Sequence, residues 1–485
     1  MSQDIRNLEP KALWNKFSDL NEVPRGSKKE EKVIAFMADF GKNLGLETII
    51  DPIQNVIIKK PATPGMENRK TIVMQSHLDM VHQKNGDTVF DFDKDGIKMI
   101  IENGWVTAEG TTLGADNGLG VAAIMSVLES SDIPHPAIEA LFTIDEETGM
   151  TGAKGLQAGY LDGEILLNLD TEEDTELDIG CAGGIDVTAT KKYVEEVFSG
   201  DDVAFKITVK GLRGGHSGMD IHRGFGNANK IMNRIFEAVH PYIHISEIQG
   251  GSLRNAIPRE SFATVICNPV DIIDAKDKIN EIAKNIKQEF SEIEPNLVIN
   301  FEKTGNFKKA ISKEEQSKLI KAVNNALNGV HKMSEEMEGL VEASNNIAIV
   351  NLKDGNIQID CLTRSSVEES KAEVANLLKA AFEKEGFKVE FSGSYPGWSP
   401  NANSPILSVM EDLYESIFDK KADVVACHAG LECGILGTNY PDMDMISFGP
   451  TIKGAHSPDE RANIASAQKF WKYLLEILKN IPVKE

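Results

Sequence analysis

Four apolar segments of this sequence each run into a histidine or an acidic residue, and helical patterns separate several of them. The segments are residues 71–75, 140–144, 165–169 and 443–448. Residues 118–129 and 466–479 carry apolar side chains at helical spacing. Strands that alternate with helices favour an α/β domain, with a central sheet covered by helices. Such domains bind ligands beyond the carboxyl ends of their strands, so we expect a functional site there.

The middle of the chain has a different pattern. Amphipathic strands are predicted at residues 203–209, 261–266 and 356–362, and polar helices at 275–289 and 367–384. If His456 joins the acidic residues of the N-terminal part, the segment between them must be an insertion, and it is too large for a loop. We therefore predict a catalytic domain of residues 1–185 and 391–485, interrupted by an α+β domain of residues 186–390. The turn-rich residues 393–398 are the expected linker back.

Composition excludes several classes of protein. The net charge of −24 argues against a nucleic-acid partner, because phosphate binding requires clustered lysine and arginine. The apolar segments are far shorter than a membrane span, and residues 1–10 lack the apolar core of a signal peptide. Five scattered cysteines contain no CxxC pair, which fits a reducing compartment. We expect a cytoplasmic protein that does not bind membranes.

The residues at the predicted strand ends share the chemistry of metal ligands. They are His77 and Asp79, Asp116, the run Asp145-Glu146-Glu147, Asp170 and His456. Each motif alone has a simpler interpretation: a surface turn, a helix N-cap or a solvated strand end. Three adjacent carboxylates repel one another, however, unless a cation or solvent compensates their charge.

Taken together, these residues suit two metal ions. Zinc accepts imidazole nitrogen and carboxylate oxygen, and no thiolate is required. A carboxylate can bridge two ions about 3.5–4 Å apart, and one acid remains to move a proton. Asp79 is placed to accept the second imidazole proton of His77. Co²⁺ or Mn²⁺ can also occupy sites of this kind.

Five ordered motifs resemble those of the dinuclear zinc aminopeptidase/carboxypeptidase family. They are His77-Leu78-Asp79, Gly114-Ala115-Asp116-Asn117-Gly118, Asp145-Glu146-Glu147-Thr148-Gly149, Leu169-Asp170 and Gly454-Ala455-His456-Ser457. The resemblance covers nearly the whole chain, including residues 214–218 of the middle segment. It implies a zinc-peptidase catalytic domain, with the inserted domain as a lid over the metals.

The resemblance also implies the roles of the metal ligands. His77 and Asp170 would bind one zinc ion, and Glu147 and His456 the other. Asp116 would bridge the two ions. The peptide bond that follows the bridging residue is often cis in such enzymes.

The catalytic roles follow by the same resemblance. Glu146 would be the general base that activates a zinc-bridging water, and Asp79 would orient His77. His216 resembles the lid histidine that polarises the scissile carbonyl.

Substrate-binding roles and the substrate class are also implied by the resemblance. Asn255 and Arg364 resemble lid groups that hold the substrate carboxylate, and Gly430 a position in a substrate loop. The activity implied is hydrolysis of dipeptides, in particular Xaa-His dipeptides such as carnosine. A homodimer is compatible with the family.

Other functions remain open from the sequence. The same fold could act as a tripeptidase, a carboxypeptidase or an N-acyl amino acid deacetylase. Residues 118–123 match the G-x-G-x-x-A fingerprint of an NAD-dependent oxidoreductase, although no apolar strand immediately precedes them. A non-catalytic metal-binding peptide receptor would not need Glu146.

Overall fold

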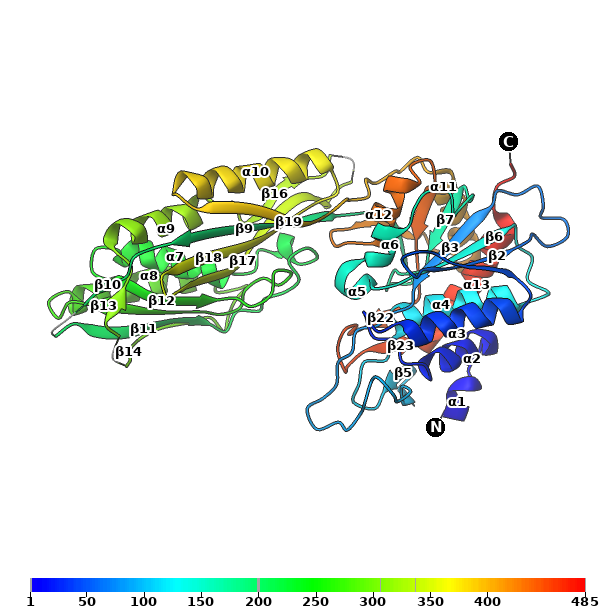
Figure 1. Ribbon diagram of the computed structural model, residues 1–485, viewed down its shortest axis with the longest axis horizontal. Coiled ribbons are helices and arrows are strands. Elements are labelled where there is room, and N and C mark those ends of the chain that lie inside the picture. Colours follow the sequence, from blue (N-terminus) through cyan, green and yellow to red (C-terminus); the bar gives the residue numbers. More distant parts are fainter. Residues whose placement is uncertain (1, 199–200, 306, 336, 485) are drawn as a thin grey trace. The chain divides into compact units, whose positions relative to one another are not determined.

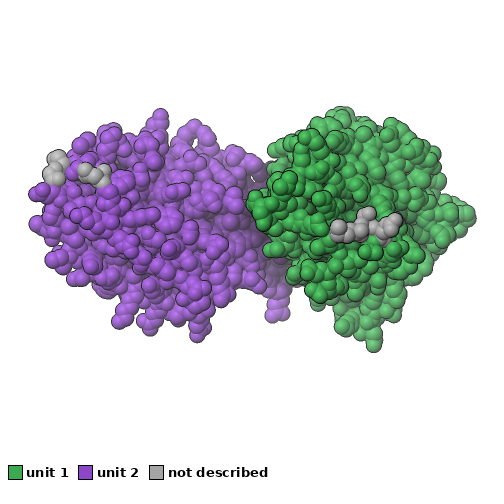
Figure 2. All heavy atoms as spheres, turned by 90° about the horizontal axis from the view of Figure 1, so that it is seen from below, with its two compact units in different colours: residues 1–180, 398–426, 431–485 green, residues 181–397, 427–430 purple. Residues whose placement is uncertain are grey.

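The computed structural model describes residues 2–198, 201–305, 307–335 and 337–484, which form two compact units (Figure 2). Unit 1 comprises residues 1–180, 398–426 and 431–485, and unit 2 comprises residues 181–397 and 427–430. Unit 2 is thus an insertion in unit 1. Its ends differ by a few residues from the expected boundaries at 185 and 390. The short return of residues 427–430 to unit 2 was not expected.

Unit 1 is built on an eight-stranded sheet (Figure 1). The strands in spatial order are β1 (Glu47–Ile50), β2 (Val56–Lys60), β6 (Ile138–Thr143), β3 (Ile72–His77), β7 (Ile165–Asn168), β21 (Asp444–Ser447), β8 (Glu176–Cys181) and β20 (Asp423–Cys427). The four central strands β6, β3, β7 and β21 are parallel. Every residue of β3, β6 and β7 is buried, which is typical of parallel strands covered on both faces. Their carboxyl ends therefore meet at one edge of the sheet.

Helices and a smaller sheet complete unit 1. The helices are α1 (Ser2–Arg6), α2 (Lys11–Asn21), α3 (Glu31–Asn43), α4 (Ala115–Glu129), α5 (Glu146–Gly149), α6 (Thr151–Gly155), α11 (Pro405–Phe418), α12 (Glu432–Asn439) and α13 (Ile464–Asn480). The smaller sheet has the order β22 (Ile452–Lys453), β23 (Arg461–Asn463), β5 (Trp105–Ala108) and β4 (Met99–Glu102). Helix α4 packs on β3 and helix α11 on β21.

Unit 2 is an antiparallel sheet with helices packed on it. The strands are β14 (Val298–Lys303), β11 (Val203–Lys210), β13 (Ser261–Cys267), β12 (His244–Gly250), β17 (Val341–Lys353), β18 (Asn356–Ser365), β9 (Gly183–Lys192) and β19 (Lys388–Tyr395), and β16 (Gly329–Met333) pairs with β17. The helices are α7 (Ala228–Val239), α8 (Ile272–Glu289), α9 (Lys313–Asn325) and α10 (Glu368–Lys384), with the short turn η1 (Ile221–Arg223). Strands β10 (Glu196–Val197) and β15 (Lys309–Ala310) form a separate pair. An apolar core joins the helices to the sheet.

One local expectation was wrong. Residues 393–395 were predicted to start the linker back to the catalytic domain, but they belong to β19. Strand β19 continues pairing with β9 as far as the partners Tyr395 and Gly184. The turn-forming residues of this segment therefore shift the register between β19 and β9, but β19 continues beyond them.

Candidate active site

His77 is the last residue of β3 and its ring is held by main-chain geometry. The side chain is buried, and Nδ1 lies 3.1 Å from the carbonyl oxygen of Asp79. A carbonyl oxygen can only accept, so Nδ1 carries a proton, and Nε2 faces the carboxylates of the site. The carboxylate of Asp79 is slightly farther from Nδ1, at 3.4 Å. Asp79, the expected partner of His77, thus lies beside its ring, and the shorter of the two contacts is to the main chain of Asp79.

The carboxylate of Asp79 has a second set of contacts. It is fully buried and accepts hydrogen bonds from the main-chain N–H groups of Glu146 and Glu147, at 3.0 and 3.3 Å. The hydroxyl of Ser27 also donates to it, at 2.7 Å. Asp79 thus fixes the backbone that carries both acids.

Asp116 lies between the two histidines of the site. Oδ1 is 3.2 Å from Nε2 of His77, and Oδ2 is 3.1 Å from Nε2 of His456. Burial alone would raise the pKa of this carboxyl, but the hydrogen bonds from His456 and His77 lower the pKa well below its usual value. The peptide bond from Asp116 to Asn117 is cis, as expected.

Asp170, Glu147 and His456 complete the arrangement. Asp170 Oδ1 lies 3.5 Å from His77 Nε2, and Glu147 Oε2 lies 2.9 Å from His456 Nε2. Hydrogen bonds with Asp116 and Glu147 raise the pKa of His456 to about 11. One group of ligand atoms is therefore His77, Asp116 and Asp170, another is Asp116, Glu147 and His456, and each lies within 4.8 Å. Asp116 belongs to both.

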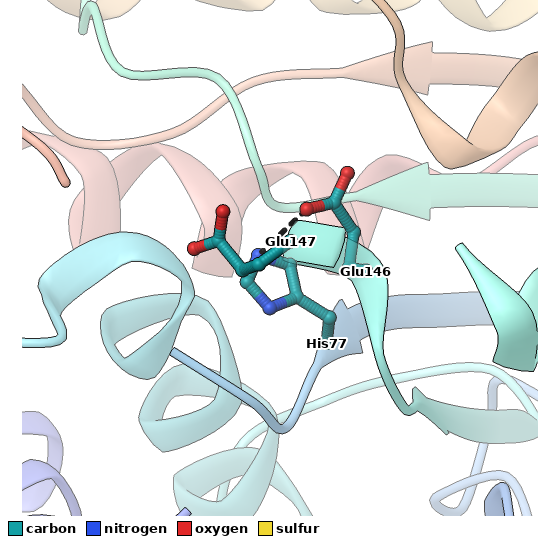
Figure 3. A group of neighbouring side chains, drawn as sticks. All are labelled: His77, Glu146 and Glu147. Carbon is teal, nitrogen blue, oxygen red and sulfur yellow. Dashed lines mark ion pairs between the residues drawn. The ribbon is translucent and has the colours of Figure 1, made fainter. Parts of the chain in front are cut away.

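Glu146 belongs to the same site, and it forms a further group of candidate ligand atoms with His77 and Glu147. Figure 3 shows its carboxylate above the ring of His77, with Oε2 4.0 Å from Nε2. Burial, followed by the charges of Asp170 and Glu147, raises the pKa of this carboxyl well above its usual value, although His77 acts in the opposite direction. A carboxylate of raised pKa is a stronger base for accepting a proton.

The side chains present fit two cations. Nitrogen and carboxylate oxygen are suitable zinc ligands, and no thiolate is needed. Oε1 of Glu147 is buried and has no hydrogen-bond partner among the described residues. A buried acceptor without a partner is costly, and a cation would satisfy it. The surplus of carboxylates also fits a site completed by positive charge.

Sequence reasoning missed Glu460, which organises the loop that carries Asp116. Oε2 of Glu460 accepts hydrogen bonds from the N–H groups of Leu113 and Gly114, at 2.7 and 2.9 Å. Oε1 accepts from those of Ala115 and Asp116, at 2.7 and 3.2 Å. The carboxylate is buried, so these four contacts replace its solvation. Four successive N–H groups at the start of a helix need acceptors, but the sequence does not show which acid provides the accepting carboxylate.

We expect Glu460→Gln to destabilise the protein by about 3 kcal/mol, because an amide places an N–H donor against two main-chain donors. The measurement is the free energy of unfolding in urea. Asp459→Asn is the matched control, since this neighbouring side chain is exposed. Equal stabilities of the two variants would contradict the role given to Glu460.

The predicted lid residues lie in unit 2. Arg364 Nη2 is 3.3 Å from His216 Nε2, and Arg364 Nη1 donates to the hydroxyl of Tyr395 at 2.9 Å. Asn255 is exposed, and its carbonyl oxygen accepts from the N–H of Ser217. The structure therefore brings the three predicted lid residues His216, Asn255 and Arg364 into one neighbourhood.

Gly430 lies within residues 391–485, which were expected to form the second part of the catalytic domain. It belongs to the segment of residues 427–430 that groups with unit 2. The neighbouring His428 is buried and hydrogen-bonded to Ser344 Oγ at 2.8 Å. These contacts, which the sequence does not reveal, draw the segment into unit 2.

The fold and the site together define a metal-dependent hydrolase of two units. A model of Peptidase family M20/M25/M40 matches residues 73–480, and the chain belongs to this family. It is therefore a metallopeptidase, and the fold class and family predicted from the sequence are confirmed.

Two relatives match the chain over almost its full length. The chain is 43% identical to the cytosol non-specific dipeptidase of Escherichia coli strain K12, over 99% of this chain and 100% of the relative. It is 44% identical to the aminoacylhistidine dipeptidase of Vibrio alginolyticus, whose crystal structure matches with a TM-score of 0.89 over 100% of both chains. Human carnosine dipeptidase 1 has the same fold, with a TM-score of 0.51 at 13% identity over 99% of this chain and 98% of that one.

Proposed function

We propose that this protein hydrolyses dipeptides with two zinc ions held by His77, Asp116, Glu147, Asp170 and His456. The observation that carries the proposal is the position of Asp116, whose two oxygens each face one histidine. A carboxylate in this position belongs to both ligand groups and would bridge two ions. When bound, the ions would polarise the peptide carbonyl and make a water molecule more acidic.

Glu146 is the general base in this proposal. Its carboxylate accepts a proton from the attacking water and delivers it to the nitrogen of the leaving amine. The raised pKa, caused first by burial, suits a group that holds a proton between these two transfers. Asp79 supports the transfer by binding the main-chain N–H groups of Glu146 and Glu147.

Groups of unit 2 would bind the rest of the substrate. We assign His216 to the carbonyl oxygen of the scissile bond, where it would stabilise developing negative charge. Arg364 and Asn255 would hold the substrate carboxylate, and Gly430 would line the substrate loop. The hydrogen bond between Tyr395 and Arg364 holds the guanidinium in a defined position, which supports this assignment.

The substrate class comes from the two relatives that are 43% and 44% identical to this chain. One is named a non-specific dipeptidase and the other an aminoacylhistidine dipeptidase. We therefore propose dipeptides as substrates, with Xaa-His dipeptides such as carnosine among them.

The name of the Escherichia coli relative also supports a cytoplasmic location. Among the described residues, no helix has the length and apolar character needed to cross a bilayer. A homodimer remains part of the proposal.

The alternative of a dinucleotide-binding protein has no support. Residues 118–123 lie within the buried helix α4. A side chain at Gly120 would meet the carbonyl oxygen of Leu169 at 2.7 Å, so this glycine serves close helix–strand packing.

We expect the zinc-loaded protein to cleave Gly-His, Ala-His, carnosine and Gly-Leu, and to lose this activity after chelation. Leu-Gly-Gly and N-acetylornithine are expected to remain intact. The measurement is amine release, with the zinc content of each sample determined in parallel. Cleavage only of the tripeptide or the acetylated amino acid would overturn the substrate class. Activity that survives complete removal of metal would overturn the metal site.

A further inference from the structure

A row of buried polar side chains crosses the main sheet of unit 1. Gln75, Asn168, Ser447 and Asp178 are successive register partners on β3, β7, β21 and β8. The first three are fully buried and Asp178 is 5% exposed. The interior of a sheet covered on both faces normally holds apolar side chains. Four polar partners in succession therefore need a physical reason.

Hydrogen bonds connect this row at one end to a buried acid. Oγ1 of Thr171 lies 2.7 Å from Oδ2 of Asp178 and 2.8 Å from Oγ of Ser447. Ser447 is hydrogen-bonded in turn to Oδ1 of Asn168. Nδ2 of Asn168 lies 2.5 Å from Oε1 of Gln75.

The other end of the row is also a buried acid. Nε2 of Gln75 and Oγ1 of Thr143 each lie 2.6 Å from Oε2 of Glu432, the first residue of α12. Glu432 is fully buried. We call the connected set the polar ladder; its members are Asp178, Thr171, Ser447, Asn168, Gln75, Thr143 and Glu432.

The number of protons available in the ladder limits how many of its two acids can be ionised. Each hydroxyl group has a single proton to donate. Ser447 donates its proton to Asn168, so the contact between Thr171 and Ser447 must use the proton of Thr171. Asp178 then needs a proton of its own to form a hydrogen bond with Thr171.

If every hydrogen bond of the ladder runs in the opposite direction, the acid that needs a proton is Glu432 and no longer Asp178. The orientation of an amide is deduced from its hydrogen-bond network, so both amides can be turned round. The hydroxyl protons then point towards Asp178, which can be ionised. Gln75 now presents its amide oxygen to Glu432, and Glu432 must carry the proton. With both acids ionised, one contact of the ladder would have no proton.

We propose that Asp178 and Glu432 share one proton through the polar ladder and act as positioning residues beneath the active site. Gln75 and Asn168 each stand two residues before a predicted metal ligand. On β3, Gln75 and His77 lie on the same side of the strand. The ladder thereby ties the carboxyl ends of β3 and β7 to each other. Its ends lie on β8 and α12, outside the set of proposed ligands and the base.

The electrostatic surroundings favour retention of a proton. Burial raises the pKa of Asp178 to about 7 and that of Glu432 also to about 7. The charged groups that act on them are Glu176 and Asp170 for Asp178, and His77, Asp170, Asp79 and Glu146 for Glu432. Most of these groups are acids, which disfavour a second negative charge.

The test counts protonated carboxyl groups by infrared difference spectroscopy on folded, metal-loaded protein near pH 7. We expect Asp178→Asn and Glu432→Gln each to lose one carboxylic-acid C=O band relative to the wild type. Each amide supplies a permanent donor, so the remaining acid can ionise. The double variant is expected to lose one band and no more. Loss of two bands in the double variant, or of none in either single variant, would show that the acids titrate independently.

Two further variants keep the proposal testable if an amide variant is unstable. Ser447→Ala breaks the ladder but retains both acids, and it is also expected to lose one band. An unchanged spectrum would overturn the shared proton. Asp444→Asn on β21 is the control, because this acid binds Ser404 and the N–H of Ile406 outside the ladder. Its spectrum in the same band region should match that of the wild type.

The positioning role has its own measurement. Asp178→Leu has no donor and is expected to weaken metal binding by about tenfold, the usual effect of losing a group that supports metal ligands. Asp178→Asn retains a donor and is expected to keep metal affinity within about twofold of the wild type. Equal metal affinities of the two variants would contradict the positioning role and leave the proposed peptidase activity untouched.

Discussion

Replacement of Glu146 by glutamine is expected to lower kcat for dipeptide hydrolysis by about 10³- to 10⁴-fold, the upper range for loss of a general base. Glutamine has nearly the same size but cannot accept the proton of the attacking water. Both metal ions should remain bound, because the group of His77, Asp116 and Asp170 and the group of Asp116, Glu147 and His456 are complete without Glu146. The measurements are kcat and bound metal per chain.

Glu129→Gln is the matched control for this experiment. It makes the same change at an acid on α4 that pairs with Lys16 at the surface. Its kcat should stay within about twofold of the wild type, as for a surface substitution. Near-normal turnover of the Glu146 variant would exclude this residue as the base. Loss of metal together with turnover would instead indicate that Glu146 is a ligand.

Asp116→Asn is expected to reduce bound metal from two ions to one or none and to lower kcat by about 10³-fold or more. An amide has a single oxygen acceptor, so one of the two histidines would face an N–H group in place of a carboxylate oxygen. The measurements are metal content after dialysis and kcat at saturating zinc.

The control for this variant changes an acid that is equally polar but lies outside the site. Asp162→Asn alters an exposed acid whose side chain is 3.4 Å from Lys59. It is expected to retain two ions and full turnover. Retention of both ions by the Asp116 variant would contradict a bridging role and indicate two separate sites.

The sequence predicted the main sheet of unit 1 well because the proposed ligands lie at or just beyond the ends of strands. Residues 71–75 and 165–169 were expected as strands and correspond to β3 and β7 within a few residues. Parallel strands place their carboxyl ends together, so residues far apart in the chain could be assigned to one site. The cis bond after Asp116 was also expected, from the family resemblance.

Contacts between side chains and main-chain groups could not be predicted in this way. Glu460 binds four N–H groups of a distant segment, and nothing in the spacing of the acids marks it. The second role of Asp79 depends on the turn that starts α5. Such contacts are decided by loop geometry, which periodicity and motifs do not encode.

The polar ladder shows the same limit for the sheet. Gln75 and Asn168 precede recognisable motifs, but their neighbours Ser447 and Asp178 are fixed by strand order and register. The hydrophobic pattern of one sequence shows that a strand is buried, but it does not show which strands lie beside it or in which register. The grouping of Gly430 with unit 2 was missed for a related reason, since it depends on tertiary contacts of His428.

The position of β21 between β7 and β8 has a consequence for biosynthesis. Both neighbours belong to the first 181 residues, whereas β21 begins at Asp444. At about 5–20 residues per second, the ribosome needs tens of seconds to make the chain between them. During that time the facing edges of β7 and β8 have no strand between them, and unpaired edges promote aggregation. All residues of unit 2 are synthesised before β21, so we expect the nascent N-terminal segment to keep these two strand edges unpaired until β21 has been made.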